Sequence, residues 1–127
     1  MMDILSKFSL PGILLLLTMG FGVWVSLTGK PYNGLLFNLH KLIALATLVF
    51  LVIRLAAVLK SAPAHAAVMA LLIFAAVCVL ALFVTGALMS IGIPQYQLVL
   101  TVHRISLVLL PMAMAGALYL LNAARQV

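Results

Sequence analysis

The sequence predicts an all-α membrane protein, a four-transmembrane-helix up-down bundle built from two repeated helical hairpins. Of its 127 residues, 68% are hydrophobic and 6% are charged, whereas about a quarter of the residues of a soluble domain are charged. The apolar residues form four runs, each long enough for the ~20 residues that cross a bilayer. Only short segments connect these runs, so successive helices must run antiparallel.

The elements follow in order along one integral membrane domain, 1–127. The spans are expected at 8–29, 35–59, 65–91 and 98–122. Between them lie the segments KPYNG from Lys30, KSAPA from Lys60 and GIPQYQ from Gly92. Their proline and glycine residues interrupt a helix, so these segments predict the three turns.

The charge pattern indicates a lipid environment. Seven Lys and Arg residues stand against one acid, Asp3, for a net charge of +6. The basic residues occur singly near span ends, so lipid headgroups and not nucleic acid are the expected partner. No carboxylate falls inside a span, which disfavours cation-coupled transport and proton relays. Four basic residues on one face, against three on the other, predict that both termini are cytoplasmic; the four are Lys7, Arg54, Lys60 and Arg125.

An internal repeat of 63 residues relates the two halves of the chain, about 1–63 and 64–127. Lys41 meets Arg104 in this alignment, which preserves the charge. The identical pairs are Gly29 with Gly92, Pro31 with Pro94, Leu35 with Leu98 and His40 with His103. The period equals one helical hairpin, so the repeats enter the membrane in the same direction.

The repeat places His40 and His103 at one depth, a few residues inside the same membrane face. Two neutral imidazoles at one depth form the axial pair that a six-coordinate haem iron accepts. Lys41 and Arg104 are the expected partners of the two haem propionates. No C-x-x-C-H motif is present, which excludes covalent haem attachment of the c type.

Small residues stand at the level of the histidines on the neighbouring spans. Gly22 and Gly86 are expected to leave room for a flat macrocycle, although glycine is also common at helix contacts in membranes. The alternatives for His40 and His103 are interfacial residues that bond headgroups or loop carbonyls, or ligands of zinc or copper. Two ligands alone make a poor tetrahedral zinc site.

Two segments, NLHKLIALATLVFLVIRL and TVHRISLVLLPMAMAGALYLL, resemble the ligand helices of membrane-embedded four-helix b-type cytochromes. These include the haem-bearing subunits of bacterial respiratory oxidoreductases. The resemblance implies haem b between His40 and His103, a quinone or a partner redox subunit for electron exchange, and the bacterial inner (plasma) membrane as location.

The sequence departs from that family at one point. Many such proteins carry a second histidine about fourteen residues further along a ligand helix, for a second haem. Here those positions are Arg54 and Ala117. We therefore expect a single haem, in an electron-transfer subunit rather than a stand-alone enzyme.

A second interpretation fits the same residues. The chain would be a non-redox four-span protein, a structural or assembly subunit of a larger membrane complex. Its glycines would then serve helix packing, and its histidines would be interfacial. A carrier of small anions that uses Lys41 and Arg104 is a third hypothesis, which rests on charge alone.

Overall fold

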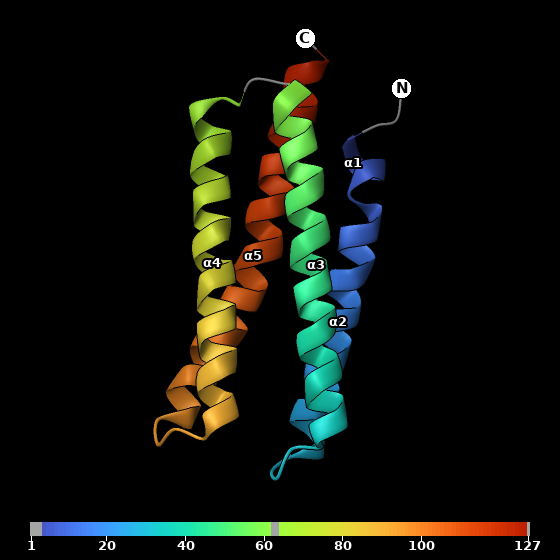
Figure 1. Cartoon of the computed structure of the whole chain (residues 1–127). Coiled ribbons are helices and arrows are strands. Elements are labelled where there is room, and N and C mark those ends of the chain that lie inside the picture. The colour runs from blue at the N-terminus through green and yellow to red at the C-terminus, as the bar shows by residue number, and fades with distance from the viewer. Residues whose placement is uncertain (1–3, 62–63, 127) are drawn as a thin grey trace. The chain divides into compact units, whose positions relative to one another are not determined.

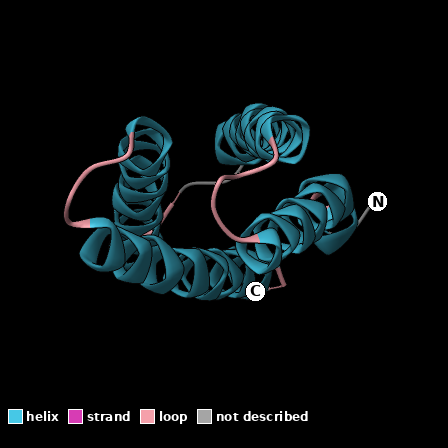
Figure 2. Cartoon of the chain, turned by 90° about the horizontal axis from the view of Figure 1, so that it is seen from below, coloured by secondary structure: helices cyan, strands magenta, loops and turns pink. Residues whose placement is uncertain are grey.

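The computed structural model describes residues 4–61 and 64–126, and all regular secondary structure in these ranges is helical (Figures 1 and 2). The helices are α1 (Ile4–Lys7), α2 (Ser9–Thr28), α3 (Gly34–Ser61), α4 (Ala66–Ile91) and α5 (Tyr96–Arg125). Four of them, α2 to α5, are long and apolar enough to cross a membrane. The predicted all-α fold is confirmed, and the chain is an integral membrane protein with four spans among its described residues.

The chain divides into two compact units, Met1–Ala62 and Pro63–Val127. In the first unit α2 packs against α3, and in the second α4 packs against α5. Each unit is one helical hairpin, whose connecting loop is drawn in pink in Figure 2. The shift of 63 residues that aligns the histidines also aligns α2 with α4 and α3 with α5.

The helix bounds differ from the predicted spans by at most three residues. α2 and α4 each lie within one residue of the predicted bounds at both ends. α5 begins two residues before the predicted span and ends three residues after it. Its 30 residues extend about 45 Å, more than the ~30 Å hydrocarbon core, so its ends reach the headgroup region. Ala62 and Pro63, part of the second predicted turn, lie outside the described residues.

The turn residues of the two hairpins explain where the helices stop and start. Gly29 follows α2 with φ 69° and Gly92 follows α4 with φ 73°, a backbone region that glycine adopts without steric cost. Asn33 precedes α3, and its side-chain oxygen accepts hydrogen bonds from the backbone N–H groups of Leu35 (3.0 Å) and Leu36 (3.2 Å). Asn33 thereby satisfies two donors at the helix start, as capping residues do.

A short helical turn, α1, precedes the first span and was not predicted from the sequence. Its end at Lys7 has a local cause. Pro11, in the first turn of α2, lacks an N–H, and its ring crowds the carbonyl four residues back, which belongs to Lys7. Pro111 lies inside α5, and the helix continues past it, as membrane-spanning helices tolerate.

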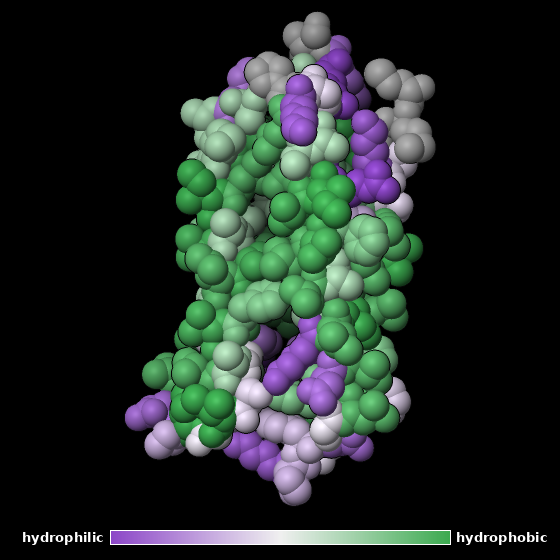
Figure 3. Space-filling view, in the orientation of Figure 1, coloured by the Kyte–Doolittle hydropathy of each residue, from purple (hydrophilic) through white to green (hydrophobic). Residues whose placement is uncertain are grey.

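The surface has the character of a membrane protein. Hydrophobic side chains cover the middle lengths of the helices, and hydrophilic side chains gather toward the helix ends (Figure 3). Large apolar side chains such as Leu16, Leu80 and Val108 are exposed. Lipid tails are the solvent that such a surface requires.

A pair of buried threonines joins α2 to α3. The hydroxyl oxygens of Thr18 and Thr47 lie 3.1 Å apart. Each hydroxyl also lies within hydrogen-bond distance of a carbonyl on its own helix, Leu14 O at 2.8 Å and Ile43 O at 2.7 Å. The two hydroxyls have only two protons for these three contacts. The interhelical hydrogen bond therefore forms when one threonine donates to the other and not to the carbonyl on its own helix.

We predict that Thr47→Val lowers the stability of the protein. The change keeps the shape of the side chain and removes one interhelical hydrogen bond, worth about 0.6 kcal/mol and at most about 1.7 kcal/mol in a membrane. Unfolding of the full chain in detergent measures the effect. The control is Thr101→Val, because the exposed Thr101 hydroxyl donates to the carbonyl of Gln97 on its own helix. Equal losses in both variants would contradict the prediction.

Candidate functional site

His40 lies on the face of α3 that packs against α2. Its ring nitrogen Nδ1 is 2.9 Å from the backbone carbonyl oxygen of Thr18. A carbonyl oxygen only accepts, so Nδ1 must carry the proton. In the neutral imidazole the lone pair is then on Nε2, the form in which a histidine binds a metal while a second group orients the ring.

Gly22 makes this approach of His40 to α2 sterically possible. A Cβ atom placed on Gly22 would lie 3.0 Å from Cε1 of the His40 ring and 3.4 Å from its Nδ1. A side chain at this position would therefore displace the imidazole. Gly20, two residues earlier on α2, has open space where its Cβ would be.

His103 is held in the second hairpin by Thr85 of α4. Nδ1 of His103 is 2.8 Å from the hydroxyl oxygen of Thr85. That hydroxyl in turn lies 2.6 Å from the carbonyl oxygen of Ala81 and 3.2 Å from that of Leu82. The carbonyls only accept, so with the hydroxyl proton on the Ala81 carbonyl the hydroxyl oxygen accepts from Nδ1–H of His103, whereas with Nδ1 unprotonated the hydroxyl donates to it. The first arrangement gives His103 the same tautomer as His40.

The two histidines stand at similar distances from the starts of their helices. His40 lies six residues after Gly34, the first residue of α3, and His103 lies seven residues after Tyr96, the first residue of α5. At 1.5 Å per residue these distances are about 9 and 10.5 Å. Each imidazole is half-buried.

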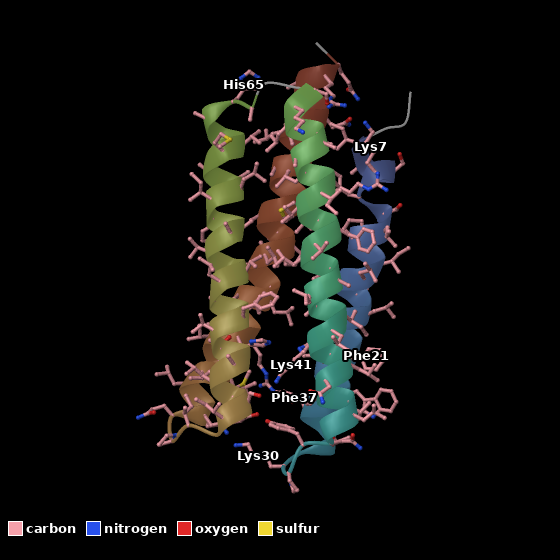
Figure 4. All side chains as sticks on the ribbon, viewed as in Figure 1. Lys7, Phe21, Lys30, Phe37, Lys41 and His65 are labelled. Carbon is pink, nitrogen blue, oxygen red and sulfur yellow. The ribbon has the colours of Figure 1, made fainter. Side chains whose placement is uncertain are left out.

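Lys41 lies on an aromatic pair at the loop end of the first hairpin (Figure 4). Its Nζ is 4.3 Å from the centroid of the Phe37 ring, within the range of a cation–π contact. Phe37 stacks on Tyr32 with centroids 5.7 Å apart and planes 7° from parallel. These rings hold the ammonium group next in sequence to His40, where an anionic group could reach it.

Arg104 and Gly86 lie close to His103. The exposed Arg104 lines a hollow of about 360 Å³ along α5, together with the apolar side chains of Ile105, Val108 and Leu109. A Cβ on Gly86 would lie 3.8 Å from Cε1 of His103, an ordinary contact. Gly86 is thus near the imidazole as expected, but the steric requirement at Gly22 is much stricter.

His65 is exposed and precedes α4, at the opposite end of that helix from Thr85 (Figure 4). It has no side-chain capping hydrogen bond. Within the described ranges, His, Cys, Asp and Glu side chains form no metal-binding group of three or more.

Sequence reasoning missed the groups that orient the histidines. Neither Thr18 nor Thr85 is predicted from the sequence to contact a histidine. The acceptor in the first hairpin is a backbone carbonyl, which every residue has and which therefore cannot be recognised from the sequence. A threonine on the helix opposite a histidine is a signal that could have been used for the second.

The fold and these contacts define a class, a four-span α-helical membrane protein with an oriented histidine in each hairpin. Comparison with protein-family models, with curated proteins and with solved structures found no match.

We predict that His40 and His103 are fixed as Nδ1–H tautomers, because Nδ1 of each lies within hydrogen-bond distance of an oxygen of the helix packed against it. His65, which is exposed, should exchange between both tautomers. ¹⁵N NMR of histidine-labelled full chain in detergent, without added haem, measures this at about pH 8.5, above the ordinary imidazole pKa of about 6.5. Nε2–H forms of His40 or His103 would contradict the hydrogen bonds described.

Proposed function

We propose that the chain is a small membrane b-type cytochrome-like protein that binds one haem b between His40 and His103. Each hairpin supplies one axial ligand near the same membrane face. The observation that carries the proposal is that Nδ1 of each imidazole lies within hydrogen-bond distance of an oxygen of the neighbouring helix. With Nδ1 as the donor, the lone pair is on Nε2. Metal-ligating histidines almost always have such a second hydrogen bond.

The donor set suits haem iron better than the other metals considered. Neutral imidazole is a preferred ligand of iron, and two axial imidazoles complete the coordination of a haem whose four other ligands come from the macrocycle. A haem bound in this way supplies a one-electron couple between ferric and ferrous iron. The protein contributes the two oriented nitrogens and the apolar surroundings that tune the potential of that couple.

Lys41 and Arg104 are the proposed partners of the haem propionates. Each follows its histidine directly in sequence, and both side chains are exposed. The contact with Phe37 reduces the freedom of the Lys41 ammonium, whose N–H groups are donors of the kind that a carboxylate accepts. The ligand would bring the negative charge that the spans themselves do not contain.

Electron transfer with a quinol or with a redox protein docked on the same face is the proposed activity. A single haem near one face serves partners on that face, and it does not by itself provide a path across the ~30 Å hydrocarbon core. The proposed setting is an electron-transfer subunit in a bacterial inner membrane.

The second candidate is a structural or assembly subunit without a redox group. It is favoured by the fact that a hydrogen bond from Nδ1 also satisfies an imidazole that only packs between helices, since every polar group in a membrane needs a partner. The two candidates differ in whether the protein binds haem.

We predict that the full chain, purified in detergent after expression with haem supply, has a low-spin b-type spectrum. His40→Ala and His103→Ala should each abolish it, because low-spin iron needs both axial ligands. His65→Ala is the control and should keep the spectrum. Colourless wild-type protein, or a low-spin haem retained in both ligand variants, would refute the proposal.

We predict that Lys41→Gln weakens haem retention about tenfold, the low end of the effect of a hydrogen bond to a charged group. The cause is the loss of a propionate partner. Lys60→Gln, a change of the same kind at the other end of α3, should leave retention unchanged. Transfer of haem to an excess of apomyoglobin measures the retention. Equal effects of both substitutions would argue against Lys41 as a propionate partner.

A further inference from the structure

The internal repeat extends to the groups that hold the histidines. The shift of 63 residues that pairs His40 with His103 also pairs Thr18 with Ala81. In the first hairpin His40 donates directly to the carbonyl of Thr18. In the second, the hydrogen-bond chain from His103 ends on the carbonyl of Ala81. The contacts of both histidines thus end on backbone carbonyls that occupy equivalent positions of the repeat.

The two hairpins differ at one position of this chain of contacts. The same shift pairs Gly22 with Thr85. Where the repeat has glycine, no side chain separates the imidazole from the carbonyl, and Nδ1 reaches it at 2.9 Å. Where the repeat has threonine, the hydroxyl stands between them, 2.6 Å from the carbonyl oxygen and 2.8 Å from Nδ1.

The steric data explain why the two arrangements are alternatives. A Cβ at Gly22 would lie 3.0 Å from the His40 ring, a tighter contact than most side chains make, so a side chain there would push the imidazole away from the carbonyl. In the second hairpin the Thr85 hydroxyl lies within hydrogen-bond distance of both the His103 ring and the Ala81 carbonyl. A side chain without a hydroxyl would fill that space and leave Nδ1–H without an acceptor, which is costly in a membrane.

We infer that Thr85 is a positioning residue for His103, and that its hydroxyl relays the hydrogen bond of the imidazole to the carbonyl of Ala81. The residue at this repeat position sets how far each imidazole stands from the neighbouring helix and which tautomer it keeps. Gly22 does this by its lack of a side chain and Thr85 by its hydroxyl. The binding of iron by the oriented nitrogen rests on the proposed function. The hydrogen-bond relay does not depend on it.

The two hydrogen-bond arrangements predict an unusual order of substitution effects. In the second hairpin, Thr85→Ser keeps the hydroxyl and Thr85→Gly opens the direct route, so both should preserve the Nδ1–H tautomer of His103. Thr85→Val, although closest in shape, should lower the ratio of Nδ1–H to Nε2–H tautomer about fivefold, by loss of one hydrogen bond.

In the first hairpin we expect Gly22→Thr to disturb His40 less than Gly22→Ala, although threonine is the larger residue. Gly22→Ala displaces the His40 ring without supplying an acceptor, and the tautomer ratio of His40 should fall about fivefold for the same reason. Gly22→Thr supplies the relay that Thr85 provides in the second hairpin, and it should keep the ratio near the wild-type value. Gly20→Ala, at a site with open space, is the matched control and should have no effect.

The test is ¹⁵N NMR of the histidine-labelled full chain in detergent without haem, for each variant. The histidine of the unmutated hairpin reports in the same spectrum whether the chain is folded. The inference is overturned if Thr85→Val keeps the tautomer of His103, if Thr85→Gly loses it as Val does, or if Gly22→Thr disturbs His40 as much as Gly22→Ala.

Haem spectra of the same variants separate this inference from the proposed function. The predicted tautomer order with no haem bound in the wild type would support the relay and refute the cytochrome. Haem bound through both histidines with tautomers that ignore residues 22 and 85 would refute the relay and support the cytochrome.

Discussion

The structure of both hairpins depends on one constraint, that an imidazole N–H inside a membrane must find an acceptor within the protein. No water is available in hydrocarbon, and an unsatisfied polar group costs several kcal/mol there. His40 and His103 meet this requirement on the helix that packs against their own. The acceptor then determines the tautomer, the direction of the ring and the small residue that must stand beneath it.

The hydrogen bonds between the helices specify the alignment of each hairpin more than they stabilise it. Each is worth about 0.6 kcal/mol on average in a membrane, and lipid tails compete equally for apolar side chains. Association therefore relies on close packing of small residues, such as Gly116 of α5, whose added Cβ would be 3.3 Å from Leu71 of α4. A histidine or threonine that must meet one particular carbonyl favours a single register among many similar packings.

Composition and spacing were sufficient to predict the four helices and their antiparallel order, since about 20 consecutive apolar residues leave few alternatives. The exact ends of α5 could not be predicted, because the apolar run marks only the part of the helix within hydrocarbon. The short helix α1 was missed because its residues lack a clear pattern. The repeat pointed to His40 and His103, and their level on the antiparallel spans pointed to Gly22 and Gly86. It did not reveal Thr18, whose carbonyl acts whatever its side chain, or the different roles of Gly22 and Thr85.

An oriented, neutral imidazole in each hairpin, followed by a basic residue, is the basis of the proposed single-haem site. The ratio of haem to chain in the purified protein, with the electron paramagnetic resonance spectrum of its oxidised form, tests this most directly. The account predicts about one haem per chain and a low-spin signal typical of two imidazole ligands. A chain without haem, a ratio of two, or a high-spin signal from iron with one imidazole would contradict it.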